Sequence, residues 1–115
     1  MAKSQLEKTY EQETSKIVSV LKKLNPQKII LFGSAAQGKI HPDSDIDICV
    51  IKETKDKWLV QNKIWDLLWD ADLTWGIEPD IKVYPPSIYY DWLSRDDPFI
   101  AEIEKGKVVY EKRQI

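Results

Sequence analysis

The sequence predicts an α/β domain in which a small mixed β-sheet is packed with helices. Two long segments, 6–24 and 56–75, carry apolar residues at helical spacing. Between and after them lie short apolar runs rich in β-branched residues, which are too short for helices and are typical of strands. No repeat or linker divides residues 1–115, so we expect a single domain. The predicted strands lie at 28–32, 46–52 and 81–84.

The first helix is expected to run from Leu6 to Leu24. Its apolar residues follow one another at spacings of four, seven, four and three, so they share one face of the helix. Pro26 disfavours helical geometry at Asn25, and the helix should therefore end there. The apolar face consists of Leu6, Tyr10, Ile17, Leu21 and Leu24.

A polar loop joins the first two strands. Gly33 ends the first strand, and we expect Ser34 to cap a short helical turn that reaches Gly38. Residues 42–44, Pro-Asp-Ser, are typical of a turn and lead into the strand 46–52.

The helix predicted at 56–75 carries two apolar faces. One face should pack on the sheet, whereas Trp58, Trp65 and Trp69 lie roughly 100° or more around the helix. Either other helices of this domain cover the tryptophans, or they contact another chain; we favour the second reading, including a homo-oligomer, because Trp is a frequent interface anchor. The sheet-facing residues are Val60, Ile64, Leu67, Leu68, Ala71 and Trp75.

The C-terminal third is expected to add a strand, two short helices and a last short strand. Asp80 follows Pro79 and opens the strand IKVY, so this strand begins with a carboxylate. Ser87 and Asp97 are residue types that cap helices, and Pro98 suits the first helical position. The two helices should end at Leu93 and Gly106, and the last strand should cover 108–110.

Composition excludes several classes of function. The net charge of −2 argues against long nucleic acid as a ligand, because proteins that bind polyanions usually carry a basic excess. Cys49 is the single cysteine, so neither an intramolecular disulfide nor a CxxC-type zinc site can form. The N-terminal segment lacks the apolar core of a signal peptide, and no run is long enough to span a membrane. We therefore expect a cytoplasmic protein.

Three carboxylates are the candidate catalytic and metal-binding groups. Asp45 and Asp47 alternate along a strand, so they project from one face about 7 Å apart. Two such carboxylates repel each other unless a cation lies between them, and Mg²⁺ prefers oxygen ligands of this kind. If the strand of Asp80 lies beside that of Asp47, three carboxylates can hold two metal ions for displacement at a phosphoryl group.

A phosphate also requires hydrogen-bond donors. Gly33 and Ser34, at the entrance of a short helix, offer backbone N–H groups and a hydroxyl, and glycine permits close approach of a ligand. Ser44 either orients Asp45 or initiates the turn, and the sequence leaves both roles open.

Residues 33–47, GSAAQGKIHPDSDID, resemble the signature of the nucleotidyltransferase superfamily that includes DNA polymerase beta. The chain length and the segment DPFIAEIEKGKVVYE are similar to the minimal nucleotidyltransferase branch. The resemblance implies a nucleotidyltransferase fold in which Gly33 and Ser34 bind the nucleoside triphosphate. It also implies that Asp45 and Asp47 bind two Mg²⁺ ions, and that Asp80 binds metal and acts as general base.

The same resemblance implies a reaction and a partner. Minimal members of the family resemble antitoxins that silence a HEPN-domain ribonuclease toxin by transferring AMP from ATP to a toxin tyrosine. Relatives often read GSRARG in the loop, whereas Ala35 and Gln37 replace the two arginines here. Because arginine stabilises phosphate charge better than a neutral side chain, a weakly active or inactive antitoxin that only binds its partner is the alternative. A small-molecule nucleotidyltransferase would need an added acceptor-binding domain.

Overall fold

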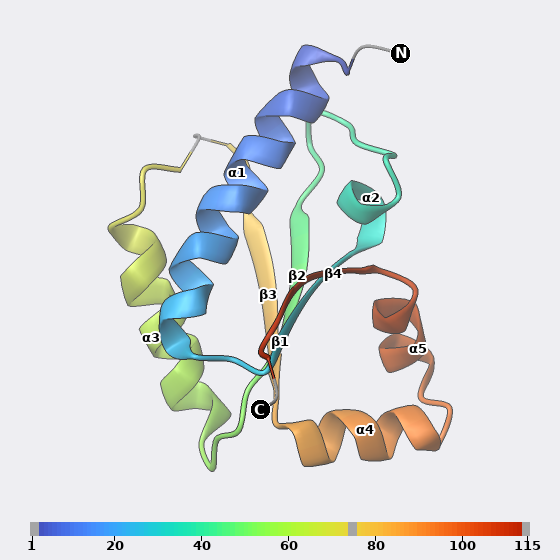
Figure 1. The fold of residues 1–115 in the computed structure, drawn as a ribbon. Helices are drawn as coiled ribbons and strands as arrows, with labels where there is room; N and C mark the ends of the chain where they lie inside the picture. Colours follow the sequence, from blue (N-terminus) through green and yellow to red (C-terminus); the bar gives the residue numbers. More distant parts are fainter. Residues whose placement is uncertain (1–2, 74–75, 114–115) are drawn as a thin grey trace.

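A mixed β-sheet forms the centre of the computed structural model, which describes residues 3–73 and 76–113 (Figure 1). Its strands are β1 (Lys28–Phe32), β2 (Ile46–Ile51), β3 (Pro79–Tyr84) and β4 (Lys107–Glu111). Within the described residues they lie in the order β3-β2-β1-β4. β1 is antiparallel to both of its neighbours, whereas β2 and β3 are parallel. The predicted strands are confirmed to within two residues.

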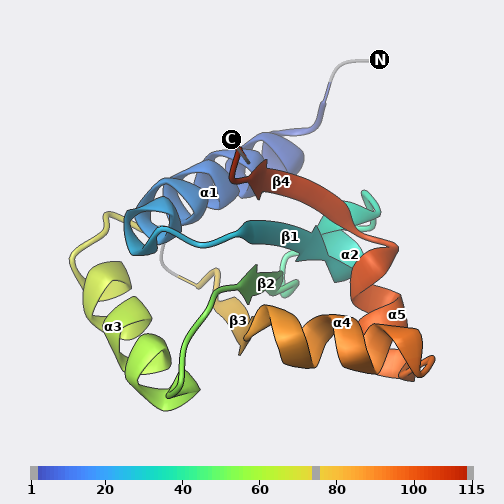
Figure 2. The ribbon, with the colours of Figure 1, turned by 60° about the horizontal axis from the view of Figure 1, so that its bottom comes forward.

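Helices cover both faces of this sheet (Figure 2). They are α1 (Gln5–Leu21) with the 3-10 turn η1 (Lys22–Leu24), α2 (Gly33–Ala36), α3 (Lys57–Trp69), α4 (Pro86–Ser94) and α5 (Pro98–Glu104). α1 and α3 lie on one face, and α4 and α5 lie on the other (Figures 1 and 2). The short helix α2 follows β1 directly. This arrangement confirms the predicted α/β class with a small mixed sheet.

Two apolar cores result, because successive side chains of a strand point to opposite faces. In β1, Ile29 and Leu31 belong to the core under α1 and α3, whereas Ile30 and Phe32 belong to the core under α4 and α5. The same alternation in β2 turns Asp47 toward the face of α4 and α5. The sheet therefore presents this carboxylate on one defined side.

The first helix ends where the sequence predicts. Asn25 follows η1 in the left-handed conformation, with a φ of 56°, and Pro26 comes next. Tyr10, Ile17 and Leu21 of the predicted apolar face are buried. The N-cap of α5 is also confirmed, because the side chain of Asp97 accepts a hydrogen bond from the backbone N–H of Ile100 at 2.9 Å.

The two predicted serine caps are wrong. Ser34 lies inside α2, whose N-cap position is Phe32, and Ser87 lies inside α4, whose N-cap position is Pro85. In α4, Pro86 occupies the first helical position, where its missing N–H costs nothing and its fixed φ suits a helix. In α2, the glycine before Ser34 takes a positive φ and lets the helix start directly from the strand.

The long helix is shorter than predicted. Asp56 caps α3 by accepting from the N–H groups of Trp58 and Leu59, but the helix ends at Trp69. Asp70 places a negative charge at the C-terminal end, where the helix dipole disfavours it. Ala71 therefore lies outside the helix, and Trp75 falls outside the described residues.

The two faces of α3 differ as expected. The sheet-facing residues Val60, Ile64 and Leu68 are buried. The three tryptophans are exposed, so no other helix of the described chain covers them, and the reading in which they complete the core of their own domain is wrong. Among the described residues, no helix is long and apolar enough to cross a membrane.

Candidate active site

The parallel pairing of β2 with β3 brings two predicted carboxylates together. Asp47 and Asp80 are direct partners in the register, and the pleat turns both side chains to the face of α4 and α5. Asp45 lies immediately before β2 and is exposed. Three carboxylates thus lie at one end of the sheet, two of them on adjacent strands and the third just before β2.

The electrostatic environment of Asp47 is that of a partly desolvated charge among like charges. Burial raises the pKa of its carboxyl group above the ordinary value, and the negative charges of Asp80 and Asp45 raise that pKa further. The positive charge of Lys82 acts in the opposite direction and lowers the pKa of Asp47. A cation among these carboxylates would relieve the repulsion.

The GS turn packs tightly against this carboxylate. Gly33 has a φ of +73°, and a Cβ atom built on it would lie 2.3 Å from Oδ2 of Asp47. A side chain at this position would therefore displace the Asp47 carboxylate. The close approach explains why a glycine is required here, and it places the first residue of α2 directly beside the acidic group.

The loop that carries Asp45 is held by α1. The buried hydroxyl of Tyr10 donates to the backbone carbonyl of Ser44 at 2.5 Å, and the carbonyl of His41 lies 3.2 Å from the same hydroxyl. The Ser44 hydroxyl accepts a hydrogen bond from the backbone N–H of His41 at 2.8 Å. These are the contacts of a turn. The hydrogen bonding of Ser44 therefore agrees with the role in which it initiates the turn.

Two neighbours of the carboxylates were not found by sequence reasoning. Lys82 Nζ lies 3.4 Å from Oδ1 of Asp80, two residues along the same strand. Phe32, the β1 partner of Asp47, contacts the half-exposed ring of Phe99 edge to face, with ring centroids 6.0 Å apart. The alternation of β3 could have indicated Lys82, since Asp80 and Lys82 share a face. No local signal indicates Phe99, because its contact with β1 depends on how α5 packs.

The donor set suits a hard cation, although its side chains do not form a preassembled cluster. Among the described residues, no three His, Cys, Asp or Glu side chains converge as a metal-binding group. The charges of Asp45 and Asp80 nevertheless raise the cost of ionising Asp47, and oxygen ligands of this type are those that Mg²⁺ takes together with water and phosphate. The chemistry of the residues therefore fits Mg²⁺.

Comparison with known proteins decides the family. The sequence model described as "Polymerase beta, Nucleotidyltransferase" matches residues 15–115, which include every carboxylate and the GS turn of the site described above. The chain belongs to this nucleotidyltransferase family. A relative from Haemophilus influenzae, named probable protein adenylyltransferase MntA, is 24% identical over 104 residues, which cover 90% of this chain and 82% of the relative.

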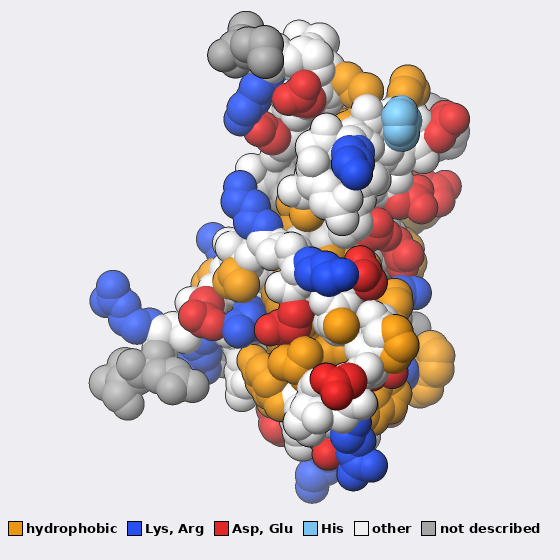
Figure 3. Space-filling model, turned by 90° about the vertical axis from the view of Figure 1, so that its right-hand side faces the viewer, with side chains coloured by type: hydrophobic (Ala, Val, Ile, Leu, Met, Phe, Trp, Pro, Cys, Tyr) orange, Lys and Arg blue, Asp and Glu red, His pale blue; other side chains and the backbone are white. Residues whose placement is uncertain are grey.

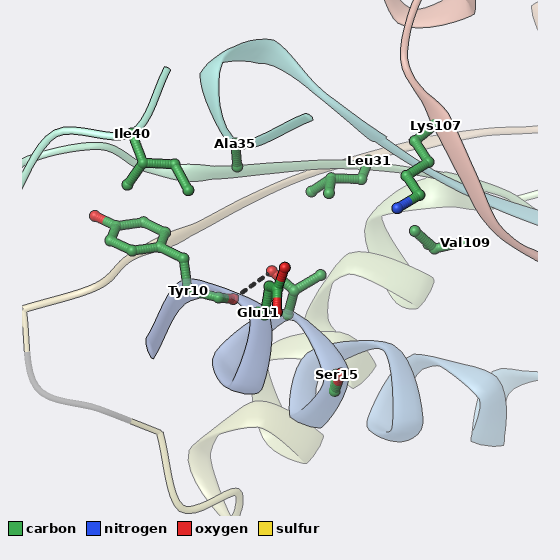
Figure 4. Close-up of a pocket in the computed structure, with 9 residues that line it drawn as sticks. Tyr10, Glu11, Ser15, Leu31, Ala35, Ile40, Lys107 and Val109 are labelled. Carbon is green, nitrogen blue, oxygen red and sulfur yellow. Dashed lines mark hydrogen bonds between the residues drawn. The ribbon is translucent and has the colours of Figure 1, made fainter. Parts of the chain in front are cut away.

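In this nucleotidyltransferase the acidic end of the sheet and a pocket beside α1 lie on different faces. A pocket of about 270 Å³ opens between α1, the GS loop and β4 (Figure 4). Leu31, Ala35 and Ile40 line it, and these residues pack with the core under α1 and α3. Asp47 and Asp80 point to the opposite face, so this pocket is not part of the carboxylate site.

The side of the nucleotidyltransferase that carries α4 and α5 exposes both acidic and hydrophobic side chains. Figure 3 shows acidic side chains gathered on this side, below the single histidine, His41, and hydrophobic side chains gathered lower down. Asp45 is exposed, Asp47 and Asp80 are partly buried, and the Phe99 ring is half-exposed.

Proposed function

We propose that this nucleotidyltransferase transfers AMP from ATP to a hydroxyl group of a protein partner. The observation that carries the proposal is the register of Asp47 with Asp80, beside the close approach of Gly33. Nucleotidyl transfer needs carboxylates and phosphate-binding backbone at one place, and these residues lie at one end of the sheet. The name of the Haemophilus relative, a probable protein adenylyltransferase, supports AMP and a protein acceptor.

In the proposed site the carboxylates hold metal and the GS turn binds phosphate, and Asp80 has a second role as general base. Asp45, Asp47 and Asp80 would hold two Mg²⁺ ions, which when bound would supply positive charge to the α-phosphate and the leaving pyrophosphate. The N–H groups of Gly33 and Ser34 donate to the triphosphate. Ser44 contributes by holding the turn before Asp45.

The bond changes follow from this arrangement. The acceptor hydroxyl oxygen attacks the α-phosphorus of ATP, the bond from that phosphorus to the bridging oxygen of pyrophosphate breaks, and Asp80 accepts the hydroxyl proton. Lys82 lies beside Asp80 and positions its carboxylate for this step. The products are an AMP ester of the acceptor and free pyrophosphate.

The acceptor we propose is a HEPN-domain protein encoded beside this chain, modified on a tyrosine. This part of the proposal rests on the resemblance of the sequence to minimal nucleotidyltransferase antitoxins. The exposure of Asp45 and the partial exposure of Asp47 and Asp80 are compatible with a protein acceptor.

Labelled ATP tests the reaction. The purified chain is incubated with Mg²⁺, its genomic neighbour and ATP labelled at the α-phosphate or, separately, at the γ-phosphate. We expect covalent label on the neighbour from the α-labelled ATP alone, and loss of that label with EDTA and with Asp47→Asn. The control Asp43→Asn, an exposed carboxylate in the same loop, should keep the transfer. Transfer that survives Asp47→Asn would contradict the proposal.

A second function, inhibition by binding alone, is favoured by one observation. Ala35 and Gln37 leave the loop without arginine, and Lys39 is its nearest cation. If the chain acts only by binding, it inhibits its neighbour equally well without ATP and as the Asp47→Asn variant. A loss of inhibition in either case would exclude this alternative.

A further inference from the structure

The tryptophan stripe of α3, formed by Trp58, Trp65 and Trp69, is an exposed apolar face of this helix. The exposed fractions of these three residues are 69%, 52% and 88%, and the neighbouring Leu59 is 66% exposed. With about 250 Å² for a whole tryptophan side chain, the three rings expose about 500 Å². That value lies at the upper end of the largest apolar patch on a typical monomer, about 300–600 Å².

We propose that two copies of this chain pair through this stripe, with their α3 helices antiparallel. A stable interface buries about 800 Å² on each partner, so the rings would supply more than half of it and the polar flanks the remainder. An antiparallel pair about a two-fold axis between Lys63 and Ile64 places Trp58 opposite Trp69 of the other copy. The same register places Asn62 opposite Trp65 of the other copy.

The charges of α3 select this orientation. Lys57 and Lys63 lie in its N-terminal half, and Asp66 and Asp70 lie in its C-terminal half or at its C-cap. Parallel helices would bring like charges together, whereas antiparallel helices bring opposite charges together and also oppose their dipoles. Charge complementarity of this kind identifies a second copy of the chain as the occupant.

One ion pair follows from the geometry of the helix. With 100° per residue, Asp66 lies about 80° and Lys63 about 140° around the helix from the centre of the tryptophan stripe, on the same side of it. Two-fold symmetry brings this side next to its own copy, and the long Lys63 side chain reaches toward the interface. Lys63 then lies within about 3 Å, along the helix axis, of Asp66 of the other copy. Neither residue makes an ion pair within the described part of the chain. The interface would contain this pair twice.

The paired surface leaves the carboxylates free. α3 packs on the sheet face opposite to the side chains of Asp47 and Asp80, and Gln61 Nε2 donates to the backbone carbonyl of Ile81 at the edge of the sheet at 2.7 Å. In both copies the carboxylates therefore lie outside the paired surface. The pairing does not depend on the transfer reaction, and it is measured without ATP or an acceptor.

Sedimentation equilibrium of the full chain tests the pairing. We expect a mass of twice 13.4 kDa at micromolar concentration, and a monomer for Trp69→Glu, whose exposed position lets the variant fold. Circular dichroism verifies that fold. The matched control Ile88→Glu, an exposed apolar residue on α4, should remain dimeric. A wild-type chain that stays monomeric at concentrations on the order of 100 µM, well above the micromolar dissociation constant expected here, or a dimer that persists in Trp69→Glu, would overturn the proposal.

Charge reversal tests the register. Lys63→Glu and Asp66→Lys each place like charges across the interface, so each variant alone should dimerise about tenfold more weakly than wild type. An equimolar mixture of the two variants should form heterodimers with near wild-type affinity. In such a heterodimer the introduced glutamate faces the introduced lysine at one contact, and the native Lys63 faces the native Asp66 at the other. If each substitution weakened association only by disturbing its own chain, mixing the two variants would not restore association. Failure of the mixture to associate would exclude this register.

Discussion

At the scale of single residues, the contact between Gly33 and Asp47 defines the candidate site most closely. The positive φ of Gly33 and the 2.3 Å separation between its ideal Cβ position and Asp47 Oδ2 leave no room for a side chain. The acidic charges around Asp47 raise the cost of burying its carboxylate. These groups therefore lower the stability of the folded chain. Substitutions at Gly33 and Asp47 test this.

Gly33→Ala should damage both the fold and the site. The left-handed backbone should cost about 1–2 kcal/mol of unfolding free energy, and the added methyl group displaces the Asp47 carboxylate. Gly38→Ala is the matched control, because its φ is +72° but nothing lies within 4 Å of its Cβ position. Urea denaturation should show similar losses for both variants, and calorimetry should show lost Mg²⁺-ATP binding for Gly33→Ala alone. Equal ATP binding by both would contradict the predicted role of this contact.

Asp47→Asn should stabilise the protein at pH 7 while abolishing transfer. The pKa of Asp47 is raised in the folded state, so the folded chain binds this proton more tightly than the unfolded chain. The contribution of Asp47 to stability therefore falls as pH rises from the ordinary value of 3.8 through the raised one. Thermal melts without Mg²⁺ should show a higher Tm for the variant at pH 7, and the difference should vanish below pH 3.8. A lower Tm for the variant at pH 7 would contradict this assignment.

At the scale of secondary-structure elements, a hydrogen bond ties the loop before β2 to α1. The Tyr10 hydroxyl of α1 reaches the carbonyl of Ser44, and Ser44 in turn closes on His41. This contact joins residues far apart in the sequence, and it fixes the position from which Asp45 and β2 begin. The helix thus supports the loop rather than the chemistry itself.

Tyr10→Phe should loosen this loop without opening the core. Losing the hydroxyl should cost about 1 kcal/mol of unfolding free energy and raise the KM for ATP more than it lowers kcat, because positioning is affected and the carboxylates remain. Tyr110→Phe is the control, since its partly exposed ring lies on β4, away from this loop. Denaturant titration and steady-state kinetics give the two values. An unchanged KM would show that the loop holds without the Tyr10 contact.

At the scale of the whole molecule, the C-terminal connection from α5 to β4 leads from the layer of α4 and α5 into the sheet. Gly106 lies at this crossing, where an added Cβ would be 2.3 Å from the Leu31 carbonyl and 2.9 Å from Phe32 Cβ. β4 then pairs with β1 and completes the sheet. The predicted helix stop at Gly106 is therefore required by close backbone packing.

Gly106→Ala should destabilise the entire fold. The methyl group cannot be accommodated by a rotamer change, because it meets backbone, and overpacking of this kind costs about 1–3 kcal/mol. Lys105→Ala, at the exposed neighbouring position, should change the free energy of unfolding by less than about 0.5 kcal/mol. Urea denaturation measures both values. A Gly106→Ala variant as stable as Lys105→Ala would show that β4 can shift along β1.

The prediction of elements succeeded where the signal is local. Alternating or continuous apolar runs indicated the strands, and Asp97 with Pro98 marked the start of α5 correctly. The caps at Ser34 and Ser87 failed because a neighbouring Gly or Pro competes for the same position within two residues. The predicted end of α3 was wrong because apolar residues at helical spacing continue past Trp69, whereas the helix ends there. The roles assigned to the site residues stay predictions.

The amino-acid sequence is sufficient for the family and for the candidate acidic and GS groups, because residue type and spacing along the chain carry that information. Gly33, Asp45 and Asp47 could be read from one segment. The placement of Asp80 beside Asp47 depended on the parallel pairing of β2 with β3, and the exposure of the tryptophans depended on which helices cover which face. Strand order and layer packing arise from contacts between distant parts of the chain, which no local spacing encodes.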